Sequence, residues 1–148
     1  MAQRSISIAW KVYLAYGIYL AVVGLLMLVI PRAVSVGAFE SFTGTVWAEF
    51  TETNVKVGDF IGLVFRLAGC MLLLVGIFKI FIALYPYRKA EAWSWWTALT
   101  IGVIAYSFVL PYGIIMGDLA SLLINVIGVV LFLVAIILPA RAMLSKKP

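Results

Sequence analysis

The chain lacks histidine altogether and has a single cysteine, Cys70, among its 148 residues. Without histidine the sequence cannot form the usual zinc sites, a histidine-ligated haem, or a Ser-His or Cys-His nucleophile system. A lone cysteine excludes an internal disulfide. We therefore expect no metal site and no catalytic residues, and the sequence leans away from an enzyme. Asp59 and Asp118 could do general acid–base work, but no further residue completes an active site.

Charged residues are also scarce. They make up 11% of the chain, whereas 66% of its residues are hydrophobic. A soluble domain needs more polar surface than that, and apolar runs of about 20 residues cross a bilayer as helices. Four such runs lie at about 12–30, 60–78, 93–110 and 119–138. The sequence predicts an all-α polytopic membrane protein, a four-helix transmembrane bundle that forms a single domain over residues 1–148 in the lipid bilayer.

The few basic residues indicate the orientation. Although the net charge is +5, they form no patch, so we expect no nucleic-acid partner. The N-terminus, the second loop and the C-terminus carry Arg4, Lys11, Arg88, Lys89, Arg141, Lys146 and Lys147. Because Lys and Arg accumulate on the cytoplasmic side, we expect a multi-pass protein of the cell (inner) membrane with both termini in the cytoplasm. The alternative of a cleaved signal peptide is less favoured, because the first apolar run exceeds the usual core of about 7–15 residues.

Prolines and aromatic residues mark the loops. Pro31 is expected to end the first helix and Pro111 the third. The outer loop, residues 31–58, contains "FTGTVWAEFTETNVKV", whose weak alternation indicates a strand or hairpin turning at Thr43-Gly44-Thr45. The alternative is a short amphipathic helix on the membrane that uses the aromatic residues Phe39, Phe42, Trp47 and Phe50. Either would cap the outer end of the bundle.

The second and fourth apolar runs share a pattern at an offset of 59 residues. One helix seam of the second run carries Asp59, Gly62, Arg66, Gly69, Leu73 and Gly76. The fourth run repeats it as acid, small, polar, small, large, small in Asp118, Ser121, Asn125, Gly128, Phe132 and Ala135. The pattern predicts a duplicated helical hairpin, in which the first two spans match the last two, with a pseudo-twofold axis along the membrane normal.

Small residues at this spacing allow helices to approach closely in lipid. The predicted helix-packing residues are Gly62, Gly69, Gly76, Ser121, Gly128 and Ala135.

Two cations interrupt the second run. Lys79 is expected to anchor the inner interface. Arg66 lies on the glycine-lined face, so we expect it to be buried and paired with Asp59, Asn125 or Asp118. This group is either a structural clasp or a ligand site in the outer half of the bundle. Tyrosines 19, 106 and 112 are available as walls of such a site.

The segment "FRLAGCMLLLVGIFKI" resembles the Arg-x-x-Gly-x6-Gly helix of the DoxX-like small four-helix membrane proteins, at Arg66, Gly69 and Gly76. The chain length, the number of spans and the position of the longest loop also fit. Some members of that group are linked to quinone-coupled sulfur oxidation or thiol redox stress. With one cysteine and no histidine, this chain takes no redox site from the resemblance.

Two functions follow as hypotheses. The first is a non-catalytic structural or accessory component of a membrane assembly, as a homo-oligomer or within a larger complex. The second is a binder or carrier of a small lipophilic or anionic ligand in the outer half of the bundle, with Arg66, Asn125, Asp59 and Asp118 as candidate ligand-binding residues. No cofactor is required, and a quinone or a lipid stays open as the ligand.

Overall fold

The structure, a computed structural model, describes residues 2–145 and confirms an all-α fold. Its helices are α1 (Ala2–Val29), α2 (Pro31–Thr43), α3 (Trp47–Thr53), α4 (Val55–Ile82), α5 (Ala92–Met116), α6 (Leu119–Ile137) and α7 (Ala140–Leu144), and a π-helical segment, η1 (Ala83–Tyr87), continues α4. Four of these helical stretches are long and apolar enough to cross a membrane: Arg4–Val29, Val55–Tyr87, Ala92–Met116 and Leu119–Ile137. The protein is therefore a four-helix membrane protein.

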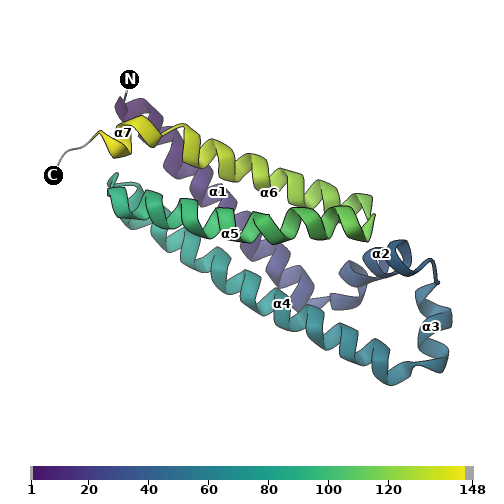
Figure 1. Cartoon of the computed structure of the whole chain (residues 1–148). Helices are drawn as coiled ribbons and strands as arrows, with labels where there is room; N and C mark the ends of the chain where they lie inside the picture. The colour runs from purple at the N-terminus through teal and green to yellow at the C-terminus, as the bar shows by residue number, and fades with distance from the viewer. Residues whose placement is uncertain (1, 146–148) are drawn as a thin grey trace.

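The long helices are arranged around α1. It packs along α4 on one side and against α6 on the other, and α5 packs on α6. Figure 1 shows that both termini lie at one end of the molecule, which we call the terminal end, and that α2 and α3 lie at the opposite end, which we call the cap end. At the cap end α4 extends past the end of α1, alongside α2 and α3.

Glycines bring α1 and α4 into backbone contact. A Cβ atom added at Gly69 would lie 2.8 Å from the Gly24 carbonyl oxygen, and one added at Gly76 would lie 2.8 Å from the Gly17 carbonyl oxygen. Only glycine leaves room for helices this close. This contact fixes the antiparallel register of the two helices.

The tightest side-chain packing lies toward the terminal end. Tyr13 and Tyr87 are fully buried, with ring centroids 4.7 Å apart. Nearby, the Trp95 indole N–H donates to the Ile136 carbonyl at 2.9 Å, and the Tyr87 hydroxyl donates to the Ala135 carbonyl. These bonds satisfy the polar tips of buried aromatic side chains and tie the ends of α4 and α5 to α6.

Helices α4 and α5 are longer than the apolar runs that predicted them. The prediction that Pro111 ends the third helix is wrong, because α5 continues through Pro111 to Met116 and ends before Gly117, whose φ of 66° is left-handed. A proline removes one intrahelical hydrogen bond, but transmembrane helices tolerate this where neighbouring groups compensate. Similarly, α4 begins at Val55 inside the predicted loop.

The loop of residues 31–58 is helical, so the hairpin alternative is wrong and the amphipathic helix alternative fits. Pro31 occupies the first turn of α2, where its missing N–H costs no bond. The ring centroid of Phe39 lies 4.9 Å from that of Trp47 and 4.8 Å from that of Phe50. Phe42 does not join them and is 59% exposed. The three packed rings hold α2 against α3.

Candidate functional site

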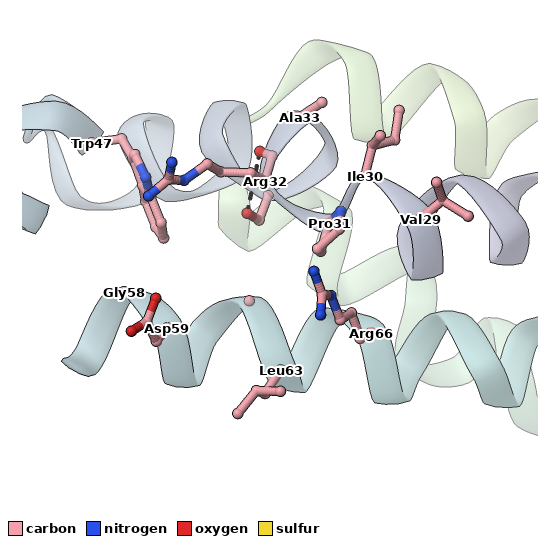
Figure 2. A pocket seen from close by; sticks show the side chains of 12 residues that line it. Val29, Ile30, Pro31, Arg32, Ala33, Trp47, Gly58, Asp59, Leu63 and Arg66 are labelled. Carbon is pink, nitrogen blue, oxygen red and sulfur yellow. Dashed lines mark hydrogen bonds between the residues drawn. The ribbon is translucent and has the colours of Figure 1, made fainter. Parts of the chain in front are cut away.

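Arg66 is exposed on α4, so the prediction that protein buries it is wrong. The reason is the unequal length of α1 and α4. Because α1 ends at Val29, the face of α4 that carries Arg66 meets the junction between α1 and α2 rather than another long helix. Figure 2 shows the Arg66 side chain pointing from α4 toward Pro31.

A pocket of about 660 Å³ lies at this junction. We call it the cap pocket. Its walls come from the end of α1, the start of α2, Trp47 of α3 and the first three turns of α4. The lining residues are Val29, Ile30, Pro31, Arg32, Ala33, Ser35, Trp47, Gly58, Asp59, Gly62, Leu63 and Arg66. Its volume is within the range of about 300–1,000 Å³ that is usual for small-ligand sites.

The charges of the cap pocket are unbalanced. Two guanidinium groups, of Arg32 and Arg66, and one carboxylate, of Asp59, line it, so the sum is +2 − 1 = +1. Among the residues that the structure describes, neither guanidinium has a hydrogen-bond or ion-pair partner. The N-terminus of α2 adds partial positive charge, and no side chain caps it.

Trp47 contributes a further donor. Its indole Nε1–H is buried without a hydrogen-bond partner, and the residue is only 7% exposed. Leaving a buried donor unsatisfied costs about 1–3 kcal/mol, so such groups are rare in native proteins. Trp47 lines the pocket as a residue, and the donors that face an entering ligand are the two guanidinium groups without a partner, which are groups that bind carboxylate and phosphate.

The structure places the other two predicted ligand-binding residues elsewhere. Asn125 of α6 lines two other hollows, which lie against a different face of α4 from the cap pocket. Asp118 lies at the start of α6. The Asp118 carboxylate accepts hydrogen bonds from the backbone N–H groups of Ala120 and Ser121. The predicted pairing of Arg66 with Asn125 or Asp118 is thus absent from the described residues. Of the four candidates, only Asp59 and Arg66 share a pocket.

The predicted helix-packing residues have different surroundings. Gly69 and Gly76 contact the α1 backbone, whereas a Cβ at Gly62 would meet nothing within 4 Å. In α6, Gly128 faces the Tyr106 hydroxyl and the Tyr19 ring, and Ala135 is fully buried. Ser121 belongs to the α6 cap and lines the same hollow as Asn125. The duplication that these positions suggested stays a prediction.

Arg32 and Trp47 were not recognised as site residues from the sequence, and Lys79 was assigned the wrong surroundings. Arg32 and Trp47 were assigned to a loop, where a charge or an aromatic ring needs no explanation. Lys79 was interpreted as an interfacial anchor, which is wrong, because it is 2% exposed inside the helix bundle. The proline before Arg32 was the one available signal, since proline marks a helix start.

No protein family, curated protein or solved structure matches the chain. The resemblance to the DoxX-like proteins therefore stays a prediction, and the function must be argued from the geometry of this chain alone.

Proposed function

We propose that this membrane protein binds the anionic headgroup of a membrane amphiphile in the cap pocket. The observation that carries the proposal is the convergence of two unpaired guanidinium groups on one cavity, next to the uncapped N-terminus of α2. An anion there would supply the missing partners, and an arginine fork binds carboxylate or phosphate oxygens in pairs. A quinone is less suited, because it carries no charge to match the cations.

The depth of the pocket agrees with a headgroup site. The stretch from Leu67 to Tyr87 leaves an uninterrupted helix about 31 Å long by the helical rise, which alone spans a hydrocarbon core of about 30 Å. Arg66 then lies at the boundary of that core, level with the α1–α2 junction. A helical side chain leans toward its own N-terminus, so the guanidinium reaches further toward the headgroups.

The test uses the purified protein in lipid nanodiscs. Phosphatidylglycerol added to phosphatidylcholine should raise the thermal unfolding temperature of the wild type, because a ligand of the folded state stabilises it. The double variant R32Q/R66Q should lose this shift. K56Q is the matched control, because Lys56 is exposed on the same end of α4 outside the pocket lining.

A second arm separates lipid from free anion. Inorganic phosphate is added to the wild type in phosphatidylcholine nanodiscs. Stabilisation by phosphate alone would indicate a soluble anion, and stabilisation by phosphatidylglycerol alone would indicate a headgroup. An equal shift in the wild type and in R32Q/R66Q, or no shift with either ligand, would contradict an anion site in the cap pocket.

A non-catalytic role is compatible with this proposal, since a headgroup-binding subunit needs no reactive residue. We keep the accessory or structural role as a prediction that rests on the missing histidine and nucleophile systems. It is checked by crosslinking in membranes followed by native mass measurement, which should detect either a homo-oligomer or a partner protein.

A further inference from the structure

Lys79 is a buried cation that the cap pocket does not use. It lies 13 residues beyond Arg66 on α4, about 20 Å away by the helical rise. Its Nζ lies 5.1 Å from the ring centroid of Tyr13 and 4.8 Å from that of Tyr16, and it donates to the Tyr13 hydroxyl at 3.5 Å. Among the described residues, the two rings and one long hydrogen bond are the polar and cation–π contacts of this ammonium group.

Among the residues that the structure describes, no carboxylate pairs with Lys79. Five of the six acidic residues lie toward the cap end, on α2, α3, the start of α4 and the start of α6, and the sixth, Glu91, precedes α5 and accepts from the Trp93 indole. None forms an ion pair with Lys79. A charged residue inside a transmembrane segment is costly and is usually paired or placed at a functional site.

Lys79 lines a cleft through the middle of the bundle. Two adjoining hollows of about 370 and 240 Å³ share five lining residues, and we call them together the central cleft. The shared residues are Val23, Leu72, Val109, Ile124 and Asn125. The cleft runs along α4 from Lys79 to Val64, about 22 Å by the helical rise, which is longer than one leaflet of a core about 30 Å thick.

Three tyrosine hydroxyls of the central cleft are already hydrogen-bonded. The Tyr16 and Tyr106 hydroxyls hydrogen-bond each other at 2.8 Å, and the Tyr19 hydroxyl donates to the Ile124 carbonyl at 2.7 Å. The other lining side chains are mainly aliphatic. The cleft thus combines one uncompensated positive charge near the terminal end with a long apolar channel.

The cleft is accessible from the side of the bundle. Its lining residues Val64 and Val75 of α4 and Ile101 of α5 are 46%, 38% and 39% exposed, and the ribbons of α4 and α5 diverge toward the cap end in Figure 1. A molecule dissolved in the bilayer can therefore enter between them without passing through water.

We propose that the central cleft binds a single-chain lipophilic acid, such as a long-chain fatty acid, with its carboxylate at Lys79 and its chain along the cleft toward Asn125. The carboxylate supplies the counter-charge that the described residues 2–145 do not place at Lys79. The combined hollow suits one acyl chain in its length and apolar walls. This site is independent of the cap pocket, because the two share no lining residue.

The test measures binding of radiolabelled palmitate to the full-length protein in phosphatidylcholine nanodiscs, with 1-hexadecanol as the uncharged analogue. The K79M variant should bind palmitate roughly 30-fold more weakly or worse, which is the order expected when one member of a desolvated charge pair is truncated. Hexadecanol should compete poorly for the wild type. K56M, which removes an exposed lysine of the same helix, should bind palmitate as the wild type does.

A second pair of variants tests the channel and leaves Lys79 in place. V109F fills the point where the two hollows join and should abolish binding, whereas V103F, on a lipid-exposed face of α5, should not. Equal competition by palmitate and hexadecanol, or unchanged binding in K79M and V109F, would overturn the proposal. So would loss of binding in R32Q/R66Q with full binding in K79M, because it would place the acid in the cap pocket.

A third measurement needs no variant and decides the matter if K79M or V109F fails to fold. Palmitate carrying a photoreactive diazirine in its chain is crosslinked to the wild type, and the labelled residues are mapped. Labels should fall on residues that line both hollows, such as Val23, Leu72 and Val109. Labels confined to lipid-exposed residues such as Phe108 and Ile114 would contradict a bound chain in the cleft.

Discussion

A single methyl group added at Gly76 should be enough to disturb the packing of α1 on α4. The new Cβ would collide with backbone atoms of Gly17 and Ala21, which cannot rotate away. We expect G76A to lower the free energy of unfolding by about 1–3 kcal/mol, as overpacking usually does. The measurement is thermal or denaturant unfolding in detergent.

Gly62 provides the matched control for that substitution, since it lies on the same helix and an added Cβ would meet nothing within 4 Å. G62A should be neutral or should stabilise by about 0.5–1 kcal/mol through helix propensity. If G62A and G76A destabilised equally, the register of the glycine contact described above would be incorrect.

Arg66 and Lys79 of α4 show what a hydropathy pattern can and cannot predict. Both were recognised as exceptional in an apolar run, but their surroundings were assigned the wrong way round: Arg66 is exposed and Lys79 is buried. The burial of each depends on where α1 ends beside α4, and that is a property of two helices together. Residue spacing within one helix cannot reveal it.

At the scale of the element, Asp118 caps α6. Its carboxylate accepts from the N–H groups of Ala120 and Ser121, two donors that the helix itself leaves free. D118A should therefore cost about 0.5–2 kcal/mol of stability, whereas D118N, which keeps an acceptor, should cost less. Both variants are compared with the wild type by thermal unfolding.

The Asp118 N-cap of α6 also predicts that stability depends on pH. Hydrogen bonds from the Ser121 side chain, and from the backbone N–H groups of Ser121 and Ala120, lower the pKa of Asp118 below its usual value of 3.8. A lowered pKa means that the folded state favours the carboxylate, so its contribution is present above pH 3.8 and is lost as pH falls through the lower folded value. The difference in melting temperature between the wild type and D118A should shrink below that pH, and a constant difference would contradict the assignment.

Helices α2 and α3 are held together by aromatic packing. Removing the ring in F39A should separate Trp47 and Phe50 from α2 and loosen the exposed connection at residues 44–46, so that proteases cleave it faster. The comparison is with F42A, which removes a ring of the same size that is 59% exposed. We expect limited proteolysis within residues 44–46 to accelerate for F39A only, and equal cleavage of both variants would refute the role of the cluster.

The helical form of this segment was one of two alternatives at the level of sequence. Its aromatic residues fit an amphipathic helix and its threonines fit a strand, and local propensity did not decide between them. Contacts between α2 and α3 decided between the two forms. The Glu40 side chain accepts a hydrogen bond from the Trp47 backbone N–H at 2.8 Å, and the Phe39 ring packs on the Trp47 ring. Such contacts join residues that propensity treats separately.

At the scale of the whole molecule, the fold places the termini together and the cap at the opposite end (Figure 1). Combined with the distribution of basic residues, this predicts that a reporter active only in the cytoplasm works when fused at the C-terminus and is silent when inserted after Thr53. The reverse pattern would invert the orientation, and activity at both positions would contradict four membrane crossings.

The apolar runs in the sequence predicted an all-α membrane protein with four spans, because runs of this length are typical of transmembrane helices. They did not predict the central cleft. The cleft exists because α5 packs on α6 and stays apart from most of α4. That arrangement depends on contacts between residues of different helices. Candidate residues from the α4 seam and the α6 seam were consequently grouped into one site. The fold instead places Asp59 and Arg66 at the cap pocket, Asn125 at the central cleft and Asp118 at the N-terminus of α6.

The contact between Gly17 and Gly76 has a mechanical consequence. Backbones in direct contact have no side chains that could repack, so α1 and α4 must move as one rigid body. Pro111, which lies between the cleft-lining residues Val109 and Tyr112, has the opposite effect on α5, because it removes a backbone hydrogen bond there. If the cleft opens to admit or release a molecule, α5 should therefore bend near Pro111. The glycine-paired helices α1 and α4 should keep their positions relative to each other.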